Sequence, residues 1–280
     1  MGVIGPAVGL GVLVLIAATI PRNLIFFANL RYYTAVPWAV PVLAAYLWLV
    51  WRYLRGTGTA GSAAGHWRGD LRANPIPLRV WAWSLLAGGL GIVGLVLALR
   101  VANRLVTLPQ QPLPDLSNVP AITMAALLVM SSLFAGVVEE ASFRGLMQTP
   151  IERRYGLALA ILITGTMFAV VHLDFTPILW PYYVAVAAIY GTITHRANSI
   201  LPAIVLHTTG NVYSNFRLWL TGRAEWQTSP GPAPLVWDTG PDASFWLAVL
   251  AMLVAAAATA SALTRITQVE RSVPLTQEVA

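Results

Sequence analysis

The sequence predicts an all-α polytopic membrane protein, with about eight transmembrane helices around an intramembrane polar cavity. Of its 280 residues, 57% are hydrophobic and only 10% are charged, and the mean hydropathy is +0.68. A soluble domain carries about 25% charged residues, so this chain cannot cover a water-facing surface of ordinary composition. The long apolar runs exclude a membrane β-barrel, whose strands alternate apolar and polar residues. The absence of cysteine excludes a disulfide scaffold.

Eight apolar runs are long enough to cross the hydrocarbon core of a bilayer, which takes roughly 17 to 25 residues. They lie at 3–20, 34–51, 81–99, 120–138, 157–175, 177–194, 199–216 and 244–264. Segments with polar residues, Pro or Gly separate them, at 21–23, 56–74, 108–120 and 222–241. We expect one transmembrane domain over residues 1–268, with a motif-bearing core at 120–216, and a short polar tail at 269–280.

Arginine supplies all 17 basic residues, and its distribution predicts the orientation of the chain. Along alternate loops, eleven arginines fall on one side of the membrane and six on the other. By the positive-inside tendency, both termini are expected to be cytoplasmic, in a multi-pass protein of the cell membrane. The net charge of +6 is scattered between the spans, which indicates contact with the lipid bilayer and not with nucleic acid. Because Arg22 follows the first apolar run, that run is expected to be a membrane helix and not a signal peptide.

A few polar residues interrupt the apolar runs, where an ionisable side chain costs at least about 2.5–3.5 kcal/mol and usually marks function. Helical spacing pairs them. Glu140 and Arg144 are four residues apart, share a helix face and are predicted to form an ion pair. That pair leaves Glu139 pointing elsewhere. Two further pairs have the same spacing, Phe168 with His172 and His207 with Asn211.

The depths of these residues in the membrane predict that they meet. The polar segment 152–156 forms a turn, with Glu139 sixteen residues before Tyr155 and His172 sixteen residues after Gly156. In an antiparallel hairpin the two side chains would lie at the same height, unless Pro150 breaks the first helix before the turn. His207 follows another polar turn, at 195–198, on the same side. The sequence therefore predicts one cluster of Glu139, His172, His207 and Asn211.

This set of side chains suits the hydrolysis of a peptide bond. A buried carboxylate can act as a general base on water, and a histidine beside it can share the proton. A second histidine with an asparagine one turn away can donate hydrogen bonds to a developing oxyanion. Alternatively, Glu139, His172 and His207 match the two-histidine, one-carboxylate ligand set of catalytic zinc, although no H-E-x-x-H motif is present. We therefore expect no required cofactor, with zinc as the alternative.

Nucleophile-based mechanisms find less support in the sequence. There is no cysteine, and no G-x-S-x-G motif lies near a histidine. An intramembrane aspartic dyad would need two aspartates in separate spans, and Asp174 is the only one near a span. Pairing of Ser132 with His172 stays open, although small polar residues in spans usually serve helix packing.

Three ordered motifs resemble a known family. Glu139-Glu140-x-x-x-Arg144, Phe168-x-x-x-His172 and His207-x-x-x-Asn211 are similar to the signature of the CAAX protease and bacteriocin-processing (CPBP) family, the type II CAAX prenyl endopeptidase-like intramembrane proteases. The resemblance covers residues 139–211 and implies a fold of eight membrane helices around a water-filled cavity. It also implies that Glu139, assisted by His172, activates water, that Arg144 positions Glu140, and that His207 and Asn211 stabilise the oxyanion.

The implied partner is a membrane-associated peptide or protein substrate, and a prenylated CAAX-like peptide is one alternative. Eukaryotic members of the family cleave prenylated C-terminal tripeptides, whereas peptide maturation or self-immunity is the alternative for bacterial relatives. Two other function classes stay open. A transporter or channel would use intramembrane Glu and His as an ion relay, usually within inverted repeats that this sequence lacks. A non-catalytic scaffold would keep the fold but lose motif residues, all of which are intact here. In isolation, each motif could also be structural, Glu140 with Arg144 as an interfacial ion pair and the others as interhelical hydrogen bonds.

Overall fold

The computed structural model describes residues 2–56, 69–108, 118–172, 177–229 and 231–272. All regular structure within these ranges is helical, as expected where a bilayer leaves the backbone no solvent partner. Eight helices coincide with the eight predicted apolar runs. They are α1 (Ile4–Tyr32), α2 (Ala39–Leu54), α4 (Leu78–Leu105), α5 (Ala121–Glu140), α7 (Leu157–Val171), α8 (Trp180–Ala197), α9 (Leu201–Thr221) and α11 (Ala243–Ser272). Short elements complete the chain: the π-helix η1 (Ala141–Gln148), α6 (Thr149–Tyr155), η2 (Pro177–Leu179) and α10 (Val236–Thr239).

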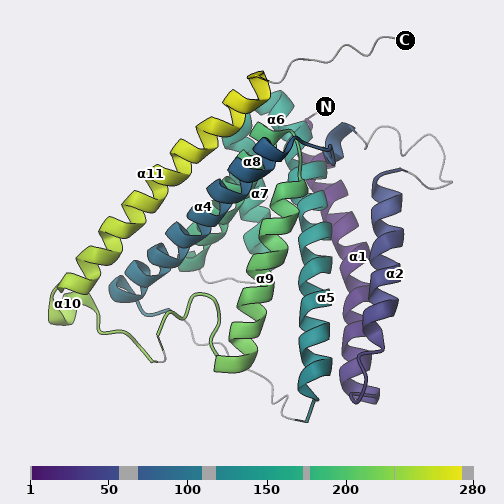
Figure 1. Cartoon of the computed structure of the whole chain (residues 1–280), viewed down its shortest axis with the longest axis horizontal. Helices are drawn as coiled ribbons and strands as arrows, with labels where there is room; N and C mark the ends of the chain where they lie inside the picture. Colours follow the sequence, from purple (N-terminus) through teal and green to yellow (C-terminus); the bar gives the residue numbers. More distant parts are fainter. Residues whose placement is uncertain (1, 57–68, 109–117, 173–176, 230, 273–280) are drawn as a thin grey trace.

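Four helical segments are long and apolar enough to span a membrane by themselves. They are Ile4–Tyr32, Leu78–Leu105, the continuous stretch Ala121–Tyr155 and Ala243–Ile266. The remaining predicted runs form helices of lower length or hydropathy, so the count of eight transmembrane helices stays a prediction. In Figure 1, α1 begins and α11 ends at the same end of the bundle, with both described ends of the chain on one side.

The predicted break at 21–23 is wrong, because α1 continues through Pro21 to Tyr32. The Arg22 side chain, expected in a loop, instead lies along the bundle and donates to the carbonyl and hydroxyl of Ser131 in α5. Neighbouring helices can satisfy the polar groups that a membrane proline exposes, which explains why the helix does not stop there. The chain reverses between Tyr33 and Trp38, where Asn29 accepts from the Ala39 N–H.

The helices pack in two groups that meet beside the motif residues. Helices α1 and α2 lie on one side of α5, and α9 packs along the other side (Figure 1). Helix α4 packs along α11, and this pair leans away from α9. Helix α7 packs along α8, which in turn contacts α4. Helix α7 also contacts η1, which follows α5. The core between these helices is formed by large apolar side chains such as Phe134, Phe143 and Phe168.

One glycine sets the closest approach of α5 and α9. A Cβ atom at Gly136 would lie 3.0 Å from the backbone N of Thr208 and 3.2 Å from the carbonyl of Ile204. Backbone atoms cannot move aside as a flexible side chain can, so only a residue without a side chain fits here. This contact brings the end of α5, with Glu139 and Glu140, against His207 of α9.

The turn that closes the predicted hairpin is present, and Pro150 does not break the helix before it. Pro150 lies in the first turn of α6, where its missing N–H has little cost. Gly156 has φ +86°, a conformation that favours glycine, and α7 begins directly after it. The Glu152 carboxylate anchors this end. It accepts hydrogen bonds from two guanidinium nitrogens of Arg72 at 2.8 and 3.1 Å and from Nδ1 of His195 at 2.8 Å.

At the opposite end, Asp242 caps α11. Its carboxylate accepts hydrogen bonds from the Ser244 hydroxyl at 2.6 Å, the Phe245 N–H at 2.9 Å and Arg104 of α4 at 2.9 Å. These bonds hold the pKa of Asp242 well below its usual range, led by the bond from Ser244. The cap therefore ties the start of α11 to α4 as long as the side chain is ionised.

Candidate active site

The first motif folds into a fully buried ion pair. Glu140 and Arg144 both have no solvent exposure, and Arg144 Nη1 lies 3.2 Å from Glu140 Oε1. The same carboxylate oxygen accepts a hydrogen bond of 2.7 Å from His207 Nδ1. The predicted pairing of Glu140 with Arg144 is thus present, and His207 is its third member. Arg144 lies in η1, a π-helix whose eight residues are all buried; such wide helical turns often occur at functional sites.

Three aromatic rings surround the Arg144 guanidinium. Its central carbon lies 5.3 Å from the ring centroid of Phe168, 5.4 Å from that of Tyr190 and 5.8 Å from that of Phe143. Cation–π attraction to a desolvated arginine is worth about 1–2 kcal/mol per good contact. The phenylalanine of the second motif therefore stabilises the charge of the first motif, which explains why Phe168 belongs to the pattern.

Glu139 has different surroundings from its neighbour. Its side chain is 19% exposed, and Oε2 lies 3.6 Å from His207 Nε2, beyond hydrogen-bonding distance. Within the described residues Oε2 has no hydrogen-bond donor, and the nearby charge of Arg22 offsets its own. No hydrogen bond or ion pair joins Glu139 to His172 in the described part of the chain, so the expected meeting of these two side chains is not formed directly.

His172 is the C-cap residue of α7, and a hydrogen bond through Nδ1 holds its ring. Its Nδ1 donates to the carbonyl of Phe168, one turn earlier, at 2.7 Å. The ring lies 4.4 Å from the Phe168 ring and stacks on Tyr183 at 5.1 Å, measured between centroids. With Nδ1 engaged, a neutral His172 keeps the lone pair of Nε2 for another partner. Ser132 is no such partner, because its hydroxyl donates to Leu128 and accepts from Asn215.

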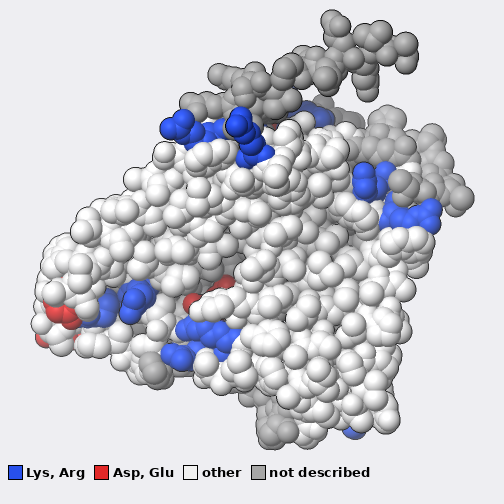
Figure 2. All heavy atoms as spheres, in the orientation of Figure 1, with Lys and Arg blue, Asp and Glu red and all other residues white. Residues whose placement is uncertain are grey.

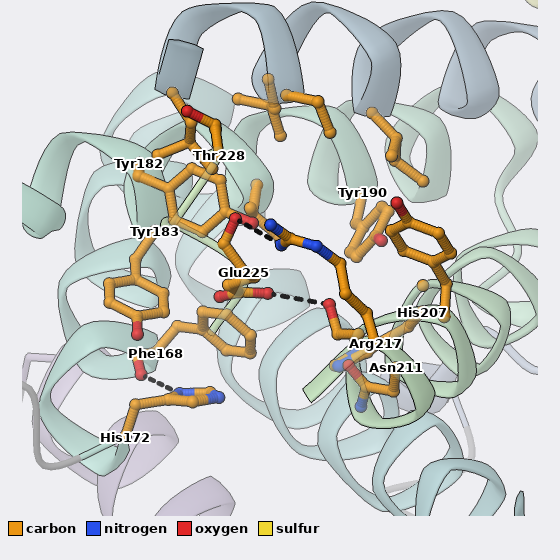
Figure 3. A pocket seen from close by; sticks show the side chains of 18 of the residues that line it. Phe168, His172, Tyr182, Tyr183, Tyr190, His207, Asn211, Arg217, Glu225 and Thr228 are labelled. Atoms are coloured by element: carbon orange, nitrogen blue, oxygen red, sulfur yellow. Dashed lines mark hydrogen bonds between the residues drawn. The ribbon is translucent and has the colours of Figure 1, made fainter. Parts of the chain in front are cut away.

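A cavity of about 370 Å³ brings the second and third motifs together. Phe168, His172, His207 and Asn211 all contribute to its wall, and Figure 3 shows them around one space. Helix α4 forms an apolar wall, with the i, i+3, i+4, i+7 series Ile92, Leu95, Val96 and Leu99. On the surface, Figure 2 shows a hollow between α4 and α9, with acidic atoms inside and basic side chains beside it. Glu139 and Glu140 are not among the lining residues and lie behind His207.

Residues 121–213 match the family model described as type II CAAX prenyl endopeptidase Rce1-like. This segment resembles the Rce1-like family. The resemblance predicted from the three motifs is thereby confirmed for the part of the chain that contains all of them. The apolar helices are those of a membrane protein, and the match makes this segment similar to type II CAAX prenyl endopeptidases. Neither the curated proteins nor the solved structures include one that matches the chain.

The Rce1-like segment does not gather the ligands of the alternative zinc site. Glu139 and His207 approach each other, but His172 interacts with Phe168 and Tyr183 instead. Within the described residues, no three His, Asp or Glu side chains are arranged to hold a metal ion. Because this donor set does not converge, we derive no step through a metal, and metal independence stays a prediction.

One acidic residue of the cavity wall lies outside the Rce1-like segment and was not predicted. Glu225 belongs to a short strap, residues 223–228, that follows α9 and turns back to the bundle, where it contributes Arg223, Glu225 and Thr228 to the cavity wall. Asn103 of α4 donates to the carbonyl of Trp226 at 2.8 Å, which fixes the strap against α4. In the sequence, Glu225 is one acidic residue in a polar segment between two spans, where a carboxylate is unremarkable.

Proposed function

We propose that the protein is an intramembrane endopeptidase that hydrolyses a peptide bond of a membrane-associated peptide or protein. The observation that carries this proposal is the contrast between two adjacent acids. Each acid leaves Oε2 without a hydrogen-bond donor among the described residues. Glu140, however, is fully buried, and its Oε1 pairs with Arg144 and accepts a hydrogen bond from His207. Glu139 is 19% exposed, and its closest charged contact is His207 Nε2 at 3.6 Å. A structural ion pair needs only one of them, so the second carboxylate is available for chemistry.

In the proposed reaction, Glu139 accepts a proton from water as the water oxygen attacks the carbonyl carbon of the scissile bond. Nε2 of His172 assists by accepting a hydrogen bond from the same water, since its Nδ1 already donates to Phe168. The C–N bond of the resulting tetrahedral intermediate then breaks, and the proton passes from Glu139 to the leaving amine. We propose that the attacking water bridges Glu139 and His172, which make no direct contact among the described residues.

His207 and Asn211 are proposed to stabilise the oxyanion of the intermediate. Both line the cavity, one helical turn apart on α9. His207 already donates from Nδ1 to Glu140, so donation from Nε2 requires a proton on both ring nitrogens. Glu140 and Glu139 lie on its two sides and favour that cationic form, which is the one able to bind an oxyanion.

The proposed substrate lies in or on the membrane, because the cavity combines reactive polar groups with an apolar wall. The α4 residues Ile92, Leu95, Val96 and Leu99 face the same cavity as the histidines and suit an apolar segment or a lipid-modified chain. We further propose that both termini are cytoplasmic. The excess of arginine on their side supports this orientation.

Cleavage of a reporter peptide by the purified protein in liposomes tests the proposal. We expect Glu139→Gln and, separately, His172→Ala to lower kcat at least about 100-fold, since each removes a group that moves a proton. Asp238→Asn is the matched control, because it removes one negative charge in α10, away from the motifs. Cleavage at the wild-type rate by a folded Glu139→Gln protein would refute the assignment.

A further inference from the structure

The strap holds Glu225 in a fixed position. Arg217 of α9 donates through Nη1 to the carbonyls of Ala224 at 3.0 Å and Glu225 at 3.4 Å, and through Nη2 to that of Gln227. The Gln227 side chain in turn accepts from the Ala224 N–H at 2.7 Å. Ala224 and Gln227 are buried as a result. The backbone of the strap is thus well bonded, while the side chain of Glu225 is left to project into the cavity (Figure 3).

The carboxylate of Glu225 has only neutral hydrogen-bond donors. It accepts from the hydroxyl of Ser214 at 3.4 Å and from the hydroxyl of Tyr182. Burial raises the pKa of Glu225, and the nearby ring of His172 opposes that effect only in part. Among the described residues, no arginine forms an ion pair with it. The carboxylate is therefore partly withdrawn from water and feels the charge of His172 and His207 only across the cavity, with no cation in direct contact among the described residues. A cation that binds directly to it would offset this loss of hydration.

The arginines that line the cavity do not replace such a partner. Arg217 uses its guanidinium on the strap carbonyls. Arg100 is exposed, and the half-buried Arg223 bonds to Thr221, so water screens both charges. Within the described residues, Glu225 is the only acidic side chain in the cavity wall. The same wall contains His172, His207 and Asn211, so a substrate bound for reaction lies beside Glu225.

We infer that Glu225 is a specificity-determining residue that binds a basic side chain of the substrate close to the scissile bond. This inference rests on the proposed endopeptidase function and deepens it. A lysine or arginine would supply the cation that the cavity carboxylate lacks, forming a charge-assisted hydrogen bond. Glu225 lies beyond residue 213, where the Rce1-like match ends, so the inference rests on the strap and the cavity and not on the match.

A peptide series tests the inference, with one lysine moved stepwise across the scissile bond and norleucine as the neutral replacement. We expect kcat/KM to favour lysine about tenfold at one position, as for a charge-assisted hydrogen bond that is partly desolvated. In Glu225→Gln the ratio of lysine to norleucine should fall to about one. Glutamine keeps the size of the side chain and can still accept from Ser214 and Tyr182. Asp238→Asn, which removes the same charge elsewhere, should keep the tenfold ratio.

A binding measurement separates failure of this inference from failure of the proposed function. Peptide affinity is measured with Glu139→Ala, which leaves the cavity wall intact, and with the Glu139→Ala/Glu225→Gln double variant. The lysine peptide should bind about tenfold tighter than the norleucine peptide to the first variant and equally to the second. An equal preference in both variants, or none in either, overturns the role of Glu225. If the wild-type protein cleaves no peptide but the binding preference behaves as stated, the endopeptidase proposal fails and the cation site stands.

Discussion

Replacing Arg144 by methionine should destabilise the protein strongly. At a separation of 3.2 Å and an effective dielectric constant of about 20, the attraction between Arg144 and Glu140 amounts to about 5 kcal/mol. Desolvation reduces the net value of such a pair, but removal of one member leaves the other buried and uncompensated, at a cost of about 3–5 kcal/mol. The three aromatic rings also lose their cation. Methionine roughly preserves the volume, so a cavity adds little to this loss.

Thermal unfolding in detergent, followed by tryptophan fluorescence, measures the effect. We expect the Tm of Arg144→Met to fall by about 10 °C, since 1 kcal/mol corresponds to about 2–4 °C in a chain of this size. The double variant Glu140→Gln/Arg144→Met should recover most of the loss, because the Glu140 carboxylate is no longer left buried without Arg144. Arg153→Met is the matched control: its ion pair with Asp70 is exposed, and its loss should shift Tm little. A single Arg144→Met variant that melts with the wild type would refute the reasoning.

Four further outcomes follow from the structure. Gly136→Val should push α5 from α9 and abolish cleavage, whereas Gly9→Val, where a Cβ atom meets nothing within 4 Å, should leave the rate unchanged. Asn211→Ala should lower kcat about 100-fold with little change in KM, since an oxyanion donor acts in the transition state; an equal change in KM would point to substrate binding instead. Because the folded pKa of Asp242 is depressed, its contribution is complete above the ordinary aspartate pKa of about 3.9 and is lost as pH falls through the folded value. The Tm difference between wild type and Asp242→Ala should therefore be constant from pH 7 to 5 and shrink only in strong acid. Finally, chelation should leave the cleavage rate unchanged, and restoration of a lost rate by zinc alone would contradict the metal-free mechanism.

The apolar runs and the motif spacing predicted the parts of the fold that depend on local rules. Each apolar run became a helix, and the i, i+4 spacing of Glu140 and Arg144 gave the expected ion pair. Proline misled the prediction at Pro21, because a membrane helix can continue where neighbouring side chains satisfy its polar groups.

Long-range packing determined what the sequence could not indicate. Equal depth of Glu139 and His172 did not ensure contact, because the close packing of α5 on α9 turns Glu139 toward His207. Nothing in the residue pattern signals that Glu225 enters the cavity, since the strap is held there by Arg217 and Asn103 through backbone carbonyls. Every residue has a backbone carbonyl, so a side chain that bonds to the backbone requires no particular residue type as its partner. The sequence therefore contains no pattern that would reveal such a contact.

The π-helix η1 has a consequence for how this protein can change length. Successive residues of an α-helix are rotated by about 100°, while the wider turn of a π-helix accommodates an extra residue. Deletion of one residue within 141–148 would let the segment relax to an α-helix, and the residues after it would keep their orientation relative to Glu140. Gln148, which bonds to Gly191 of α8, and α7 with His172 would therefore stay in register. A further deletion would have no extra residue to remove, so it would rotate everything that follows by about 100°, and we expect it to abolish activity.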